Sequence, residues 1–293
     1  FISMLLPLSS SAQTSSSLWK KYDVAVEKDR PKDALAVLQT IANNAVLEKE
    51  WGDLLRAEFA ALEMHWTISA DSLQPKLAEL EQKALAAENG EPVLAAVYNA
   101  CLGKFYSLNY PLITGKTNES KALSRQFFEK ALKDKQLLAD AKARRYEPLL
   151  VQGDASRTFD NDLLHVIAFE AGEYAMAREW YESHGNRAAA CLSALYQVQK
   201  ERSEDIREVR HSKYTATIDS LIHVYRDLPE AGELAIEHFN FMDQATDASA
   251  QEKVEYIDYA LRSWPTWPRM VVLKNARQRI TLPSFHAFFN ETK

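Results

Sequence analysis

The stretch AFEAGEYAMAREWYESHGN, residues 168–186, has the spacing of two helices joined by a tight turn. Gly172 falls at the turn, and Tyr174 follows it by two residues. Ala177 places a small side chain where the two helices would touch, and Tyr181 places a bulky one four residues later. Small residues let paired helices approach closely, and bulky ones fill the groove of the neighbouring pair. The stretch therefore predicts a packed helical hairpin.

Three other stretches carry the same order of small and bulky residues. The matching positions are Ala34, Leu38 and Ile41, then Ser124, Phe128 and Ala131, then Ile257, Ala260 and Pro265. The order is that of a tetratricopeptide repeat, although His184 replaces an expected alanine and the intervals depart from the usual period of about 34 residues. We therefore predict an all-α protein, an α/α superhelix (solenoid) of degenerate tetratricopeptide-like helical pairs.

Composition favours long helices elsewhere in the chain. Hydrophobic residues make up 46% of the 293 residues, with only 8 glycines and 10 prolines to interrupt a helix. Apolar periodicity predicts the following helices: 16–28, 32–48, 50–67, 72–88, 91–108, 119–134, 160–171, 173–183, 186–200, 212–227, 230–242, 250–263 and 267–280. We expect a polar loop over 109–120 and a charged linker or helix end over 200–212.

These elements suggest two groups of helical pairs, with a seam where Pro148 and Gly153 interrupt a less regular region. The first group is expected over 13–145 and the second over 146–280. Residues 281–293 change to an aromatic-rich pattern, which we interpret as the start of a linker to a missing downstream domain.

The first residues resemble the end of a secretory signal peptide. An apolar run precedes Ser10 and Ala12, which would stand at positions −3 and −1 of a cleavage site. We expect 1–12 to be a signal-peptide remnant, and the protein to be exported to the periplasm or cell surface of a Gram-negative bacterium. No other run is apolar enough to predict a membrane span.

The net charge of −6 gives no general attraction for nucleic acid. Two small basic clusters are exceptions, and we interpret both as solvated faces or ion pairs between helices. They are Lys142, Arg144 and Arg145, and then Lys274, Arg277 and Arg279. Cys101 and Cys191 lie in alanine-rich helical patterns, which favours buried free thiols over a disulfide or a metal site.

Acidic and imidazole side chains gather around the opening stretch. His165, Glu170 and Glu173 could form an acid–base group, whereas Glu179 and Glu182 share one helix face. His165 and Glu170 are five residues apart, off a common helical face, and no hydrolase, metal or nucleotide motif occurs. We interpret the acids as a solvated outer face and His165 as a helix-interface residue after an N-cap at Asp162. No catalytic residue, cofactor or metal is predicted.

The segment SWPTWPRM contains Trp264 and Trp267. It could be a stacking platform for a sugar or peptide, or a turn between helices, and the turn is the preferred interpretation. The candidate residues for contact with a ligand or partner are Trp264, Trp267, Tyr174, Tyr181 and His165.

Three phrases of the sequence together resemble one protein family. They are LWKKYDVAVEKDRPKDALAVLQTI (18–41), WGDLLRAEF (51–59) and DASRTFDNDLLHVIAFEAGEY (154–174). They look like the N-terminal tetratricopeptide-like helical region of exported alpha-2-macroglobulin-like (MG2-domain) proteins of Bacteroidetes. In that family, β-sandwich domains follow, often with a thioester domain that traps proteases. This chain has no thioester motif around Cys101 or Cys191, so the resemblance implies a scaffold rather than a trap.

The expected function is a non-catalytic scaffold or protein-interaction module at the N-terminus of a larger exported protein. Its expected partner is another protein or the downstream domains of the same chain. One alternative is a SusD-like glycan- or peptide-binding component of the cell envelope, which would use Trp264 and Trp267. Another is a hydrolase built on His165, Glu170 and Glu173.

Overall fold

The computed structural model describes residues 15–151, 153, 155–204, 211–245 and 247–282. Across these residues the regular structure is helical, apart from one isolated bridge between Lys142 and Asp162. The all-α prediction is therefore confirmed for this part of the chain. The predicted signal remnant, 1–12, and nearly all of the predicted linker, 281–293, lie outside it. None of the described helices has the length and apolar character needed to cross a bilayer.

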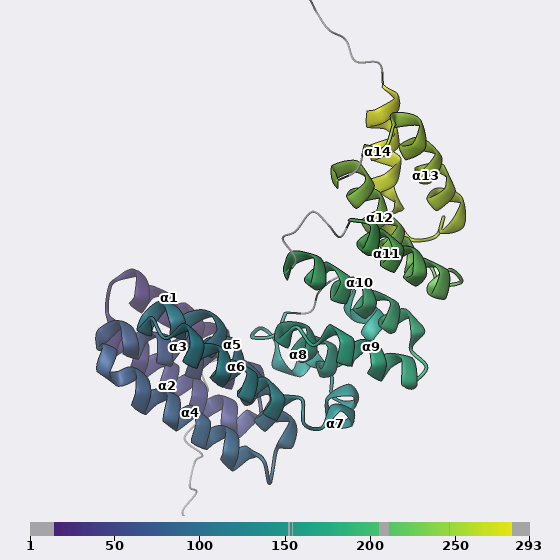
Figure 1. Cartoon of the computed structure of the whole chain (residues 1–293). Helices are drawn as coiled ribbons and strands as arrows, with labels where there is room; N and C mark the ends of the chain where they lie inside the picture. Colours follow the sequence, from purple (N-terminus) through teal and green to yellow (C-terminus); the bar gives the residue numbers. More distant parts are fainter. Residues whose placement is uncertain (1–14, 152, 154, 205–210, 246, 283–293) are drawn as a thin grey trace, which may run out of the picture. The chain divides into compact units, whose positions relative to one another are not determined.

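The chain divides into two compact units, Phe1–Ala171 and Gly172–Lys293. Each unit consists of helices that pack on their neighbours in sequence (Figure 1). The boundary follows Ala171, whereas the sequence placed a seam after residue 145. The segment between these positions stays with the first unit because its last helix, Leu163–Ala171, contacts earlier helices of that unit.

The first unit contains eight α-helices within the described residues. They are α1 (Ser15–Glu27), α2 (Pro31–Glu48), α3 (Trp51–Ile68), α4 (Leu73–Ala87), α5 (Pro92–Thr114), α6 (Thr117–Ala131), α7 (Lys135–Asp140) and α8 (Leu163–Ala171). Pro31 and Pro92 stand at the first position of α2 and α5, where the missing N–H of proline would be unpaired in any case.

The loop predicted over 109–120 is mostly helical, which corrects that expectation. Helix α5 continues through Pro111 to Thr114, and Gly115 ends it with φ +71°. Tyr110 is fully buried, and its hydroxyl donates to Glu119 and accepts from Gln74, both at 3.0 Å. Burial of this ring fixes the last turns of α5 despite the proline. The polar composition of residues 109–120 suggested a loop because it does not reveal that Tyr110 is buried against other helices.

Small residues bring α5 and α6 together. A Cβ atom on Gly103 would lie 2.9–3.1 Å from the ring of Phe128, so only glycine fits there without displacement. The hydroxyls of Ser120 and Ser124 donate to the carbonyls of Tyr106 and Gly103, respectively. These bonds satisfy polar groups at a close interface.

The second unit contains six α-helices within the described residues. They are α9 (Tyr174–Ser183), α10 (Arg187–Glu204), α11 (His211–Tyr225), α12 (Ala231–Ala245), α13 (Ala250–Ser263) and α14 (Val271–Thr281). Ser249 and Glu252 form a capping box that starts α13. Arg277 and Arg279 of α14 pair with Asp258 and Asp243. This predicted basic cluster therefore forms ion pairs between helices.

The residues that defined the predicted repeats are mostly core residues. Nine of these positions are 0–7% exposed: Ala34, Leu38, Ile41, Phe128, Ala131, Ala177, Tyr181, Ile257 and Ala260. His184, which departs from the repeat pattern, is exposed. The spacing therefore identified helix-packing positions in both units.

We expect Gly103→Ala to destabilise the first unit. The added methyl must displace the buried Phe128 ring, and overpacking a core costs about 1–3 kcal/mol. Amide hydrogen exchange of the full chain should accelerate in α5 and α6 and stay unchanged in α9 to α14. Gly90→Ala is the control, because no atom lies within 4 Å of the new methyl. Equal exchange in the two variants would contradict the close-packing argument.

Candidate functional site

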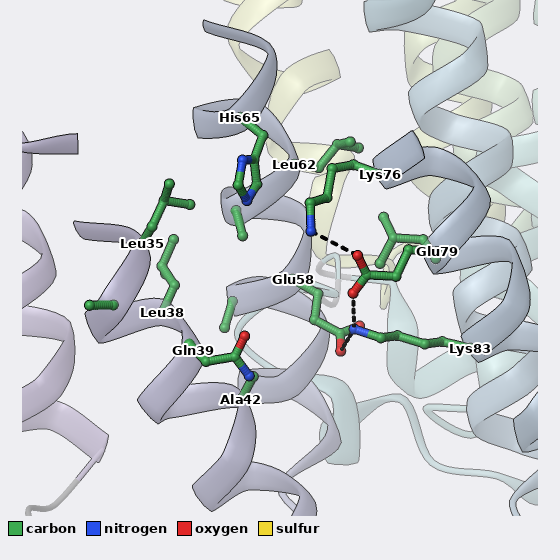
Figure 2. A pocket seen from close by; sticks show the side chains of 14 residues that line it. Leu35, Leu38, Gln39, Ala42, Glu58, Leu62, His65, Lys76, Glu79 and Lys83 are labelled. Carbon is green, nitrogen blue, oxygen red and sulfur yellow. Dashed lines mark hydrogen bonds and ion pairs between the residues drawn. The ribbon is translucent and has the colours of Figure 1, made fainter. Parts of the chain in front are cut away.

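A groove of about 290 Å³ lies over α3, with α2 and α4 as its walls (Figure 2). We call it the α3 groove. Its apolar lining includes Leu35, Leu38 and Ala42 of α2 and Ala61 and Leu62 of α3. Its charged lining is Glu58 of α3 and Lys76, Glu79 and Lys83 of α4. The groove thus has a mainly apolar wall on α2 that also contains Gln39, a floor on α3 that combines alkyl groups with Glu58 and His65, and a charged wall on α4.

The charged residues form a continuous chain of contacts. Lys76 Nζ lies 2.8 Å from Glu79, Glu79 lies 3.1 Å from Lys83 Nζ, and Lys83 Nζ lies 3.0 Å from Glu58. The hydroxyl of Tyr98, on α5, donates to the other oxygen of Glu58 at 2.5 Å. Positive and negative groups alternate along the wall, as Figure 2 shows, and the four charges sum to zero.

These contacts favour the charged forms of Glu79 and Lys83. The hydrogen bond from Lys76 is the main cause that lowers the pKa of Glu79. Burial acts to lower the pKa of Lys83, but attraction to Glu58 and hydrogen bonds to Glu58 and Glu79 raise it overall. Burial, followed by the charge of Glu58, raises the pKa of the Tyr98 hydroxyl. Glu79 and Lys83 therefore remain charged at neutral pH.

His65 stands at one end of the groove, near Lys76 (Figure 2). Burial, and then the charge of Lys76, lower the pKa of its imidazole, so the ring is neutral at pH 7. The ring makes no hydrogen bond to any residue that the structure describes. It therefore offers a donor and an acceptor at the end of an otherwise satisfied site.

The structure places His165 in a buried polar cluster. Its Nδ1 lies 2.8 Å from Asp162 Oδ1, and its Nε2 lies 3.4 Å from Ser156 Oγ. Asp162 also accepts the backbone N–H of His165 at 2.9 Å, which confirms the predicted N-cap. The three residues are only 2–6% exposed, and the ring of Phe159 stacks on the imidazole.

The order serine–histidine–aspartate resembles a nucleophilic triad, but a nucleophile must be reached by its substrate. Here burial encloses all three side chains, and the aspartate is used to start α8. The cluster joins the 3₁₀ segment Ser156–Phe159 to α8. Its geometry therefore accounts for a structural role.

The acids near His165 do not join it. Glu170 pairs with Lys104 of α5, and both side chains are about half exposed. Glu173 is exposed and precedes α9, and Glu179 and Glu182 are exposed on α9. The interpretation of these acids as a solvated face is confirmed, because all four are exposed.

Both cysteines are free thiols, as the sequence favoured. Burial raises the pKa of Cys101 to about 12, with the charge of Glu170 as a further cause. Burial is also the main cause that raises the pKa of Cys191. Both side chains are therefore protonated thiols at neutral pH, which are weak nucleophiles. Across the described residues, no three His, Cys, Asp or Glu side chains are grouped to hold a metal ion.

The two tryptophans of the segment SWPTWPRM are used within the second unit. Trp264 is 3% exposed, and its indole donates to the carbonyl of Arg226. Trp267 donates to Glu233 at 2.6 Å, and its ring lies against Gly232. Trp264 therefore presents no ring face for a sugar, and the segment is the turn between α13 and α14.

The remaining predicted contact residues are two tyrosines of α9. Tyr181 is 3% exposed and belongs to the core. Tyr174 is partly exposed and stacks on Tyr196 of α10, with ring centroids 5.7 Å apart. Of the five predicted contact residues, Tyr174 and Trp267 alone keep partial exposure. No sequence motif predicts the α3 groove, although Lys76, Glu79 and Lys83 at i, i+3 and i+7 form a charged stripe on one helix face.

His238 of α12 is a second buried imidazole. Its Nε2 lies 3.2 Å from Asp219 of α11, and its ring stacks on Tyr256 of α13. Its Nδ1 is buried with no hydrogen-bond partner in the part of the chain described. Burial lowers the pKa of His238, and the charge of Asp219 opposes this in part. A proton on this ring would therefore be unfavourable in the folded second unit.

No protein-family model matches the chain, and no curated protein or solved structure matches it. We therefore infer the function of this chain from its own sequence and structure.

We expect Asp162→Ala to destabilise the first unit by about 1–3 kcal/mol, because it leaves buried donors of His165 unpaired. Asp162→Asn keeps one acceptor oxygen and should cost less. Hydrogen exchange in α8 of the full chain measures both effects. If Asp162→Ala exchanged like the wild type while a hydrolytic activity disappeared, the structural assignment would be wrong.

The second unit should lose stability as the pH falls below about 6.5, the ordinary pKa of histidine. The pKa of His238 is lower in the folded state than in the unfolded state. As the pH falls, the unfolded chain therefore takes up the proton at a higher pH, and acid stabilises the unfolded state relative to the folded state. His238→Phe keeps the stacked ring without a titrating group, and should flatten this dependence between about pH 7.5 and 5. Exchange rates in α11 to α13 measure it. An identical slope in both proteins would exclude His238 as the cause.

Proposed function

We propose that this protein is a non-catalytic helical scaffold whose first unit binds a segment of another protein in the α3 groove. The observation that carries the proposal is the groove itself, with an apolar wall facing a charged wall on three packed helices. Binding sites are commonly apolar concavities with a few placed polar groups. The groove shares the placed polar groups of such sites, already paired with one another, beside a smaller apolar surface.

A binding role agrees with how the other reactive side chains are used. His165, Asp162 and Ser156 are enclosed, and both thiols have raised pKa values. General acid–base or nucleophilic catalysis needs a group that is accessible and poised to exchange a proton. The α3 groove contains an accessible imidazole, His65, but its neighbours are paired charges and alkyl groups.

We also propose that the helices stack as a solenoid of degenerate tetratricopeptide-like pairs. Packing between successive helices and burial of the small and bulky repeat positions support this. The further proposal, a leading module of a larger exported alpha-2-macroglobulin-like protein, is supported by the three sequence phrases that resemble that family. Reading the gene downstream of residue 293 tests it. Sandwich domains and a thioester motif are expected, and a stop codon there would refute it.

We expect Ala61→Trp to block the groove. Ala61 lies partly exposed on the groove lining, so an indole at this position would occupy the space that a bound segment needs. Peptides selected from a displayed random library against the full chain provide the probe. Their affinity by fluorescence anisotropy should fall about tenfold or more, as it does when a central contact is lost.

Ala122→Trp is the matched control, because Ala122 is exposed on α6 and does not line the groove. Its affinity for the selected peptides should equal that of the wild type. Unchanged binding by Ala61→Trp, or a failure to select any peptide, would overturn the proposal.

A further inference from the structure

We infer that the segment bound in the α3 groove is an amphipathic α-helix of a partner protein, with an acid–base–acid stripe beside its apolar stripe. This inference rests on the proposed function and adds the chemistry of the ligand. The inference follows from the backbone groups of the groove, which are already paired within helices, and from the pattern of charges on α4.

A helix suits this groove better than an extended peptide. The groove is formed by α2, α3 and α4, whose backbone groups are used inside the helices. An extended segment gains affinity by adding to a sheet edge, and here it would lose water from backbone groups without new partners. A polyproline segment needs aromatic walls, and the lining here has no aromatic side chain other than the imidazole of His65. A helix pairs its own backbone and needs only side-chain contacts.

The apolar side of the groove has helical periodicity. Leu35, Leu38 and Ala42 follow one another on α2 at intervals of three and four residues. Ala61 continues this surface on α3. Leu35 and Ala61 are partly exposed, whereas Leu38 and Leu62 are 1% exposed and belong to the core beneath them. A helix lying along the groove would place its own apolar residues, at the same intervals, over this surface.

The charged side has the same periodicity and an alternating sign. Lys76, Glu79 and Lys83 occupy positions i, i+3 and i+7 of α4, which span about 10 Å of helix. A facing helix repeats at the same interval, so the complementary order is acid, base, acid. The order is symmetric, so it serves a partner that lies in either direction along α4.

Although Lys76, Glu79 and Lys83 pair with one another, each can also form an ion pair with a bound partner. The side chains of Lys76, Glu79 and Lys83 are 37–47% exposed, and exposed ion pairs contribute little to stability. The carboxylate of Glu58 is 9% exposed and takes both of its partners from inside the unit. The three residues on α4 thus carry the recognition, and Glu58 positions Lys83.

The test uses two synthetic helical peptides of 21 residues against the full chain. Both carry leucines at intervals of three and four, and their helicity is matched by circular dichroism. One has Glu, Lys and Glu along the adjoining stripe, and the other has Lys, Glu and Lys. We expect the Glu–Lys–Glu peptide to bind about tenfold more tightly, with a preference that weakens at high salt. The chain carries a net charge of −6, so general attraction would favour the other peptide.

Exchanging Lys76 and Glu79, as Lys76→Glu with Glu79→Lys, should remove this preference without changing the net charge. The control exchanges another pair at i, i+3, Arg30→Asp with Asp33→Arg, at the start of α2 and outside the groove lining. It should keep the preference. Circular dichroism checks that both exchanged proteins are folded.

The outcomes separate the two proposals. Equal affinity for both peptides, with binding still blocked by Ala61→Trp, would overturn the charge stripe and leave the groove as a binding site. Library-selected peptides that bind in the groove while neither helical peptide binds would overturn the helical ligand. Binding of either peptide that Ala61→Trp leaves unchanged would overturn the groove itself.

Discussion

Close approach between neighbouring helices is the constraint on which this fold depends. At Gly103 the α5 backbone meets the ring of Phe128 at a distance that excludes a methyl group. In the second unit, Gly232 similarly receives Trp267 and Met270. Alanines that are fully buried, such as Ala34, Ala177 and Ala260, have the same role at other interfaces. When two helices pack this closely, neither can slide along the other without steric overlap, so each pair of neighbouring helices has a fixed position.

Local periodicity accounts for most of what the sequence predicted. Helix starts at Pro31 and Pro92 and the buried repeat positions follow from interactions within a few residues. The features that differ from the sequence predictions, namely the end of α5 and the boundary of the first unit, depend on contacts between different helices. The helix that continues through Pro111 needs Tyr110 to meet Glu119, and the extent of the first unit depends on α8 meeting α5 and α6. The α3 groove is lined by residues from three helices, so no single sequence motif predicts it.

The polar residues of this chain divide into those that fix the fold and those that remain on the surface. Glu237 accepts from Gln199, Arg202 and Tyr214 on two other helices, and Glu233 accepts from Trp267 and Arg269. Each of these buried carboxylates joins elements that sequence separates, and each has its partners in place. The acids of residues 168–186 attracted attention because they are adjacent in the sequence. Their exposure, together with the enclosed pairing of His165 and Asp162, explains why adjacency there does not make a reactive site.

The two thiols have a consequence for experiments on this protein. At pH 7, a thiol with a pKa of about 12 is a thiolate in about one molecule in 100,000, so Cys101 reacts slowly with a maleimide dye. Cys191 is buried and has a raised pKa as well. A single cysteine introduced at an exposed position would therefore take up the dye selectively in the otherwise native chain. Fluorescent probes can thus be placed on either unit without first removing a natural residue.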